Sequence, residues 1–164
     1  MDVTSIEAGQ LPVQDDQFAL SDYLKETEQK FAAPEKPVNL HWEIPDGLPQ
    51  ITTDRAKLTT ILQHIISNAI KFTEKGDIWI TAKMIRSQRQ VEINVKDTGI
   101  GIPREARALI FEKFQQVDPS TTRSYGGMGL GLYIAKVFAG TIGAAITVDS
   151  EPNKGSTFTL SVPI

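Results

Sequence analysis

The sequence lacks cysteine, long apolar runs and an excess of positive charge. Without cysteine there are no disulfides, thiolate metal sites or cysteine nucleophiles, which is typical of a reducing compartment. The most apolar stretch, 137–148, is about a dozen residues long, whereas about 20 are needed to span a bilayer. The N-terminus also lacks the basic and then apolar pattern of a signal peptide. We therefore expect a cytoplasmic domain with no direct membrane contact.

The net charge and the length of the chain further limit the possible partners and the number of domains. The chain has 17 Lys and Arg against 20 Asp and Glu, a formal net charge of −3. No global basic field would attract a polyanion, so nucleic acid is not expected as a partner and any phosphate site must be built locally. A length of 164 residues suffices for one core but not for two ordinary domains.

Hydrophobic periodicity predicts the elements. Apolar residues recur at spacings of three and four from Leu58 to Ile70, after Thr53 or Asp54 as the N-cap, which predicts the strongest helix. Weaker patterns predict helices near 21–33, 105–111 and 130–138, and strands at 39–44, 78–85, 91–95, 144–148 and 157–162. This order favours an α/β two-layer sandwich, with one sheet and the helices on one face.

The main helix carries a polar stripe along one edge, formed by Lys57, His64, Asn68 and Lys71. A solvated flank is the simpler interpretation. The alternative is functional, because Mg²⁺ prefers oxygen ligands and lysine neutralises phosphate oxygens. The helix alone does not decide between them.

Two glycine-rich segments also invite a functional interpretation. Asp97 ends a predicted strand and is followed by Gly99 and Gly101, so it forms either a simple Asx turn or a buried carboxylate that accepts a hydrogen bond from an exocyclic amine. The run 126–132 places four glycines at the start of a helix, where backbone amides bind phosphate or where helices pack tightly. Its ending is not that of a P-loop. Phe111 and Phe114 lie three residues apart, a spacing that favours a core-facing pair.

Taken together and in this order, these segments resemble the catalytic domain of sensor histidine kinases, within the wider ATPase superfamily of gyrase, the ninety-kilodalton heat-shock chaperone and MutL. Five segments in register carry the resemblance. They are the asparagine box at 65–73, the first glycine box at 97–101, the phenylalanine box at 110–114, the second glycine box at 127–132 and the last glycine box at 155–158.

The resemblance implies a Bergerat-type fold, with a mixed, mainly antiparallel sheet and a mobile ATP lid over 111–127. Carried over by position, it implies that Asn68 ligates Mg²⁺, that Lys71 approaches the phosphates of ATP, and that Asp97 holds the adenine amino group with Thr157 close by. The other implied nucleotide-binding residues are Gly99, Gly101, Ile102, Phe111, Phe114, Arg123, Gly127, Gly129, Leu130, Gly131 and Leu132.

Residues 5–11 also resemble the end of the second helix of the family's dimerisation domain. We therefore assign 1–14 to that helix tail and a linker, and 15–164 to the catalytic domain. The implied partners are the dimerisation and histidine-phosphotransfer domain of the same kinase, and a response regulator downstream. Neither His41 nor His64 precedes an acidic residue, so the phosphoacceptor histidine is expected upstream. We expect the isolated domain to be monomeric and the parent homodimeric; whether the parent is membrane-anchored is left open.

Two positions depart from the family pattern. His64 stands four residues before Asn68, where most histidine kinases have asparagine and the hydrolytic relatives have a glutamate base. An imidazole can act as a base, a hydrogen-bond donor or neither, so His64 joins Asn68 and Lys71 as a catalytic candidate. Met128 replaces the usual hydroxyl residue between lid glycines. These departures leave a nucleotide-binding pseudokinase as an alternative, whereas the missing glutamate disfavours a self-sufficient ATPase.

Overall fold

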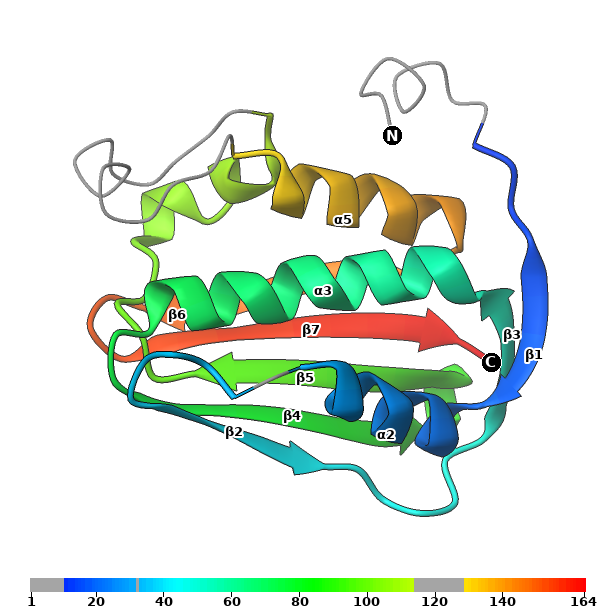
Figure 1. The fold of residues 1–164 in the computed structure, drawn as a ribbon. Helices are drawn as coiled ribbons and strands as arrows, with labels where there is room; N and C mark the ends of the chain where they lie inside the picture. Colours follow the sequence, from blue (N-terminus) through cyan, green and yellow to red (C-terminus); the bar gives the residue numbers. More distant parts are fainter. Residues whose placement is uncertain (1–10, 32, 114–128) are drawn as a thin grey trace.

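The computed structural model describes residues 11–31, 33–113 and 129–164. Its main element is a five-stranded sheet, in which only the first pair of strands, β2 and β4, is parallel (Figure 1). Across the sheet the order is β2 (Val38–Glu43), β4 (Gly76–Ile85), β5 (Gln90–Asp97), β7 (Gly155–Pro163) and β6 (Ala145–Glu151). The predicted strands and their hairpin at β4 and β5 are thereby confirmed.

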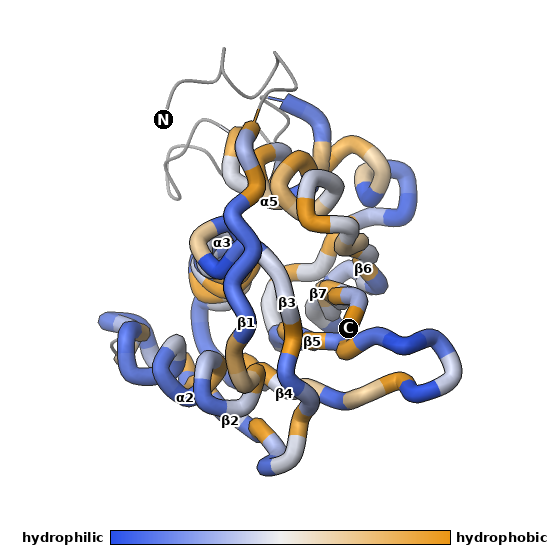
Figure 2. Tube along the Cα trace, turned by 90° about the vertical axis from the view of Figure 1, so that its right-hand side faces the viewer, coloured by the Kyte–Doolittle hydropathy of each residue, from blue (hydrophilic) through white to orange (hydrophobic). Residues whose placement is uncertain are grey.

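Three helices cover one face of this sheet, as Figures 1 and 2 show. They are α2 (Leu20–Lys30), α3 (Arg55–Phe72) and α5 (Gly131–Thr141). In β5 and β7, alternate residues point toward the helices and are buried, whereas the residues between them face outward. The two-layer sandwich with helices on one face is confirmed.

Helix α3 forms the centre of the core. Its apolar stripe is completely or almost completely buried, at Leu58, Ile61, Leu62, Ile65, Ile66 and Ala69. The side chain of Asp54 accepts a hydrogen bond from the Lys57 amide at 3.0 Å, so Asp54 rather than Thr53 is the N-cap. Within the described part of the chain, no helix is both long and apolar enough to cross a bilayer.

Two features differ from the sequence prediction. Strands β1 (Asp15–Ala19) and β3 (Gln50–Asp54) form a separate antiparallel pair that the sequence did not predict, because both are short and mostly polar. The helix expected near 105–111 is instead two 3₁₀ turns, η2 (Arg104–Ala106) and η3 (Leu109–Phe111). Ile110 is buried while its neighbour Leu109 is 51% exposed, so this segment has no apolar stripe to hold a longer helix. A third turn, η1 (Arg86–Gln88), joins β4 to β5.

Candidate functional site

The described residues predicted for the site lie toward one end of the sheet, where α3 and β5 end and β7 begins, and the start of α5 packs beside His64 of α3 (Figure 1). The Ile100 amide donates to the Phe72 carbonyl at 3.2 Å, which ties the loop after β5 to the last turn of α3. The Asn153 amide donates to the Ile100 carbonyl at 2.7 Å, which ties the same loop to the turn between β6 and β7. Motifs far apart in the sequence therefore form one cluster.

Asp97 is the most deeply buried carboxylate of this cluster, with 5% of the residue exposed. Its Oδ1 accepts from the amides of Gly99 at 2.9 Å and Ser156 at 3.3 Å. Burial raises the pKa of Asp97, and the two amide hydrogen bonds oppose this shift. Both of these donors use Oδ1, and among the described residues no hydrogen bond reaches Oδ2. The Asx turn weighed from the sequence is present, and the carboxylate is also buried.

The glycines of this loop are required by the protein's own backbone. A Cβ on Gly99 would lie 2.4 Å from the Phe72 carbonyl oxygen. Gly101 has φ +70°, and a Cβ there would lie 1.9 Å from the Glu151 carbonyl oxygen. The loop is thus held between α3 and the turn after β6. The family resemblance implies that Gly99 and Gly101 bind nucleotide, and their close contacts in the structure are with neighbouring backbone.

The polar stripe of α3 divides into two parts. Lys57 lies at the start of the helix, where its Nζ donates to Asp54 at 2.6 Å, so it does not belong to the cluster. Asn68 and Lys71 lie in the last turns and are half-buried. Partial burial lowers the pKa of Lys71, which indicates an ammonium that has lost part of its hydration. Lys36, which the sequence argument missed, donates to the carbonyls of residues 70 and 71 and caps the helix.

His64 packs against the start of α5. A Cβ added to Gly131 would lie 2.9 Å from His64 Nδ1, so the imidazole occupies the space beside that glycine. Burial lowers the pKa of His64, and the imidazole is therefore neutral at pH 7. Gly129 has φ +68° and Leu130 is the N-cap of α5. The side chain of Leu132 packs on the core.

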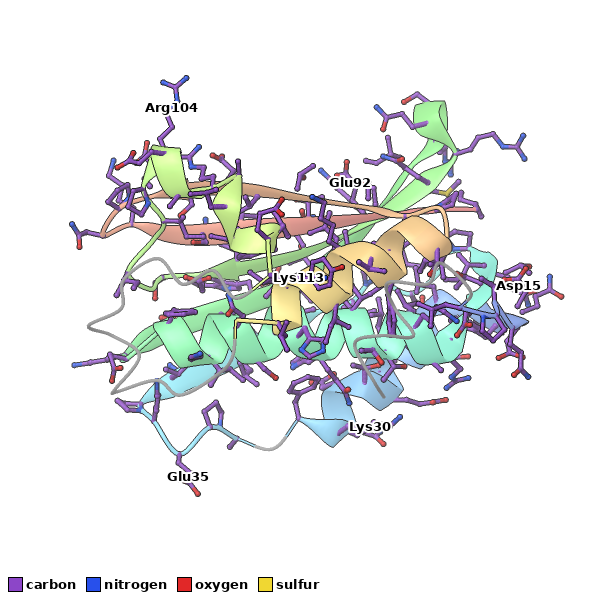
Figure 3. The ribbon with its side chains drawn as sticks, turned by 90° about the horizontal axis from the view of Figure 1, so that it is seen from above. Asp15, Lys30, Glu35, Glu92, Arg104 and Lys113 are labelled. Atoms are coloured by element: carbon purple, nitrogen blue, oxygen red, sulfur yellow. The ribbon has the colours of Figure 1, made fainter. Side chains whose placement is uncertain are left out.

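The phenylalanine box is described only in part. Phe111 packs edge-on against the core residue Phe158, with ring centroids 6.3 Å apart, which supports the core interpretation for this residue. Figure 3 shows Lys113 beside α5, and its Nζ lies 5.1 Å from the ring centroid of Tyr133. Phe114, Arg123, Gly127 and Met128 lie outside the described residues.

Thr157 does not lie beside Asp97 as the sequence argument expected. Ser156 is the register partner of Asp97 across the β5–β7 pair, whereas Thr157 pairs with Lys96 and faces the opposite side of the sheet. Ser156 is buried and takes the position beside the carboxylate. Strand phase could have identified it, because Ser156 alternates with the apolar residues Phe158, Leu160 and Val162.

Comparison with known proteins assigns the chain to a family. The profile described as "Histidine kinase-, DNA gyrase B-, and HSP90-like ATPase" matches residues 53–164. The chain belongs to this ATPase family. It is 38% identical over its full length to the autoinducer 2 sensor kinase/phosphatase LuxQ of Vibrio vulnificus strain YJ016, and covers 20% of that protein. It is 35% identical over 96% of its length to the histidine-protein kinase BarA of Escherichia coli K12, of which it covers 18%.

Solved structures agree with this assignment. Full-length ShkA in complex with AMPPNP superposes with a TM-score of 0.85 at 31% identity, over 98% of this chain and 33% of ShkA. The catalytic domain of the histidine kinase ThkA, in a nucleotide-free form, gives a TM-score of 0.74 at 25% identity, over 92% of this chain and 95% of that domain. The chain is thus an ATP-binding catalytic domain of the sensor histidine kinase type, and spans about a fifth of the curated relatives named above.

Proposed function

We propose that this domain binds Mg²⁺-ATP at the cluster around Asp97 and transfers the γ-phosphoryl group to a histidine on the dimerisation domain of the same kinase. The observation that carries the proposal is the buried Asp97 carboxylate, with Oδ1 held by two backbone amides. A carboxylate fixed in this way is ready to accept a hydrogen bond at Oδ2 from the exocyclic amine of adenine.

The residues at the end of α3 fit the other half of the ligand. Lys71 offers a partly desolvated ammonium, whose attraction for phosphate is stronger than it would be in water. Asn68 lies one turn earlier and offers an amide oxygen to Mg²⁺. In the described residues, no group of three His, Cys, Asp or Glu could hold a metal alone, so the ion would share its ligands between Asn68 and the nucleotide. Bound Mg²⁺ would neutralise phosphate charge.

The start of α5, which packs beside His64, complements these groups. The first residues of α5 present backbone amides to which a phosphate would bind, and Gly129, with its positive φ, leads into them. The side of Gly131 where a Cβ would lie is filled by His64. His64 is neutral at pH 7, so it would act on a phosphate oxygen through a hydrogen bond rather than through charge. Catalysis would rest on positioning and charge neutralisation, since a neutral imidazole on the acceptor is already a good nucleophile.

The partners follow from the same proposal. We assign residues 1–14 to the end of the dimerisation helix and a linker, and 15–164 to the catalytic domain; the start of β1 at Asp15 supports this boundary. The acceptor would be the dimerisation and histidine-phosphotransfer domain of a homodimeric parent, and a response regulator would receive the phosphoryl group next. The length of the relatives, about five times that of this chain, supports a multidomain parent.

Asn68→Ala tests the proposal directly. The matched control is Gln63→Ala, which removes an exposed amide from the same helix. Phosphotransfer from labelled ATP to an added dimerisation domain should be lost in the first variant and unchanged in the second. Transfer that survives Asn68→Ala would overturn the metal assignment. A wild-type chain that binds ATP in calorimetry but never transfers phosphate would instead indicate a regulatory module.

A further inference from the structure

Two serines form a buried pair behind the adenine-site carboxylate. Ser150 in β6 and Ser156 in β7 are 3% and 7% exposed, and their hydroxyl oxygens lie 2.8 Å apart. The Ser150 hydroxyl also accepts from the Ile102 amide at 2.8 Å and lies 2.9 Å from the Gly155 carbonyl oxygen. One side chain thus joins two strands of the sheet to the end of the glycine loop.

The hydrogens in this pair are limited. Ser150 has one hydroxyl hydrogen and two acceptors within reach, the Gly155 carbonyl and the Ser156 hydroxyl. If the hydrogen goes to Gly155, then Ser156 must donate to Ser150; if it goes to Ser156, then Ser156 must accept. In either arrangement Ser150 sets the orientation of the Ser156 hydroxyl.

The pair is connected to Asp97 on both sides of the loop. The Ser156 amide donates to Asp97 Oδ1, and a Cβ on Gly155 would lie 1.9 Å from the Asp97 carbonyl oxygen, so β7 begins against the backbone of the carboxylate residue. At the other end, Ser150 holds the amide of Ile102, five residues beyond Asp97. Within the described part of the chain, the hydrogen bonds of the Ser150 hydroxyl are to Ile102, Gly155 and Ser156 and none reaches the carboxylate, so Ser150 acts through these neighbours.

We propose that Ser150 is a positioning residue for adenine recognition. Its hydroxyl holds Ser156 and Ile102 in place, and these hold the loop that aims the Asp97 carboxylate at the base. This inference rests on the proposed role of Asp97. It adds a determinant of base selectivity that lies on β6, an edge strand of the sheet, and outside the glycine loop after Asp97.

Base selectivity separates positioning from plain structural support. Adenine offers an amine to Asp97, whereas guanine has a carbonyl oxygen at that position, which a carboxylate cannot bind. If the loop shifts and the Asp97 carboxylate no longer points at the base, ATP loses a hydrogen bond that GTP never made, and the ATP:GTP affinity ratio falls. A loss of folded protein would lower both affinities by the same factor and leave the ratio unchanged.

The test measures binding of ATP and GTP, each with Mg²⁺, to the full chain by calorimetry. Ser150→Ala should lower the ATP:GTP affinity ratio by about tenfold, the order expected when a buried amide and hydroxyl lose their partner. Ser150→Thr keeps the hydroxyl and should restore most of the ratio. Thr147→Ala removes an exposed residue's hydroxyl from the same strand and should change nothing.

A folded Ser150→Ala protein with the wild-type ratio would overturn the inference, as would an equal fall in Ser150→Thr. A second measurement needs no variant. Because coupling is reciprocal, ADP should slow hydrogen exchange at the Ile102 amide of the wild-type chain, and GDP should slow it less. Equal exchange with either nucleotide would also overturn it. A wild-type chain that binds neither ATP nor GTP would refute the proposed function itself, a different outcome from ATP binding that ignores Ser150.

Discussion

Replacing Asp54 with alanine is expected to destabilise the domain by about 4 kcal/mol. Asp54 is 4% exposed, and its Oδ1 accepts from the Lys57 amide as the N-cap of α3. Its Oδ2 accepts from the Gln14 amide at 3.0 Å and from Lys57 Nζ at 2.6 Å. The same ammonium donates to the Pro12 carbonyl at 2.6 Å. One carboxylate therefore begins α3 and ties the segment before β1 to it, at the end of the domain that Figure 2 turns toward the viewer.

The size of this destabilisation follows from the free energy lost with each contact of Asp54. Removal of an N-cap side chain costs about 1 kcal/mol. The larger loss is at Lys57, whose side chain is only 11% exposed and would keep a charge without its partner. Breaking a buried ion pair from one side costs about 3–5 kcal/mol. The two losses overlap, and a total near 4 kcal/mol is a large part of the ~5–15 kcal/mol typical of a domain.

Urea unfolding followed by circular dichroism measures this loss, and Asp54→Asn separates its parts. Asparagine caps helices as well as aspartate does, so this variant should keep the cap but lose the ion pair and the Gln14 hydrogen bond at Oδ2, at a cost of about 3 kcal/mol. Adding Lys57→Met to Asp54→Asn should recover part of the loss, because the unpaired ammonium is then gone. Asp54→Ala within 1 kcal/mol of wild type, or no recovery in the double variant, would refute the reasoning.

Three further predictions concern the site. Gly101→Ala should destabilise the fold by about 2–4 kcal/mol, because of its positive φ and the 1.9 Å approach to the Glu151 carbonyl; Gly140→Ala, with open space around it, should not, as thermal unfolding would show. Asp97→Asn should lower ATP affinity about tenfold in calorimetry while the melting temperature stays near wild type, and unchanged affinity would contradict the adenine assignment. Burial lowers the pKa of His64 in the folded domain, so as pH falls the unfolded chain binds a proton at this residue before the folded chain does. The contribution of the neutral His64 to folding stability is therefore fully present above pH ~6.5 and is lost as pH falls through the folded pKa. Urea titrations of His64→Asn between pH 7 and 5 should show a smaller loss than wild type.

Local patterns were sufficient for the helices and strands that bury apolar residues. The stripe of α3 and the alternation of β4, β5 and β7 are properties of neighbouring residues, so they can be read without knowing the partner element. The pair of β1 and β3 has no such pattern, because it is held by pairing across some 35 residues and by the contacts of Asp54. Short polar strands of this kind are defined by their partners.

The residues of the candidate site also differ in whether local sequence patterns predicted their positions. Asn68, Lys71 and Asp97 were predicted from the sequence as site residues because their chemistry stands out within recognisable motifs, and their part in nucleotide binding remains a proposal. Thr157 was placed beside Asp97 by its motif alone, whereas the register of β5 and β7 puts Ser156 there and turns Thr157 to the other face. A shift of one residue along a strand reverses its side, and only the pairing decides which residue points inward.

The sequence by itself determined the family motifs, the two-layer architecture and the chemistry of the groups proposed to bind the nucleotide, since these depend on residue type and short-range periodicity. Only the tertiary structure decided that Lys57 pairs with Asp54 at the N-terminus of α3, away from the site, and that Lys36 caps the last turn of the same helix. It also decided that Ser150 on β6 supports the loop after Asp97. These contacts join residues from separate elements, some of them tens of positions apart in the chain. Their existence depends on strand register and helix packing, which no local pattern encodes.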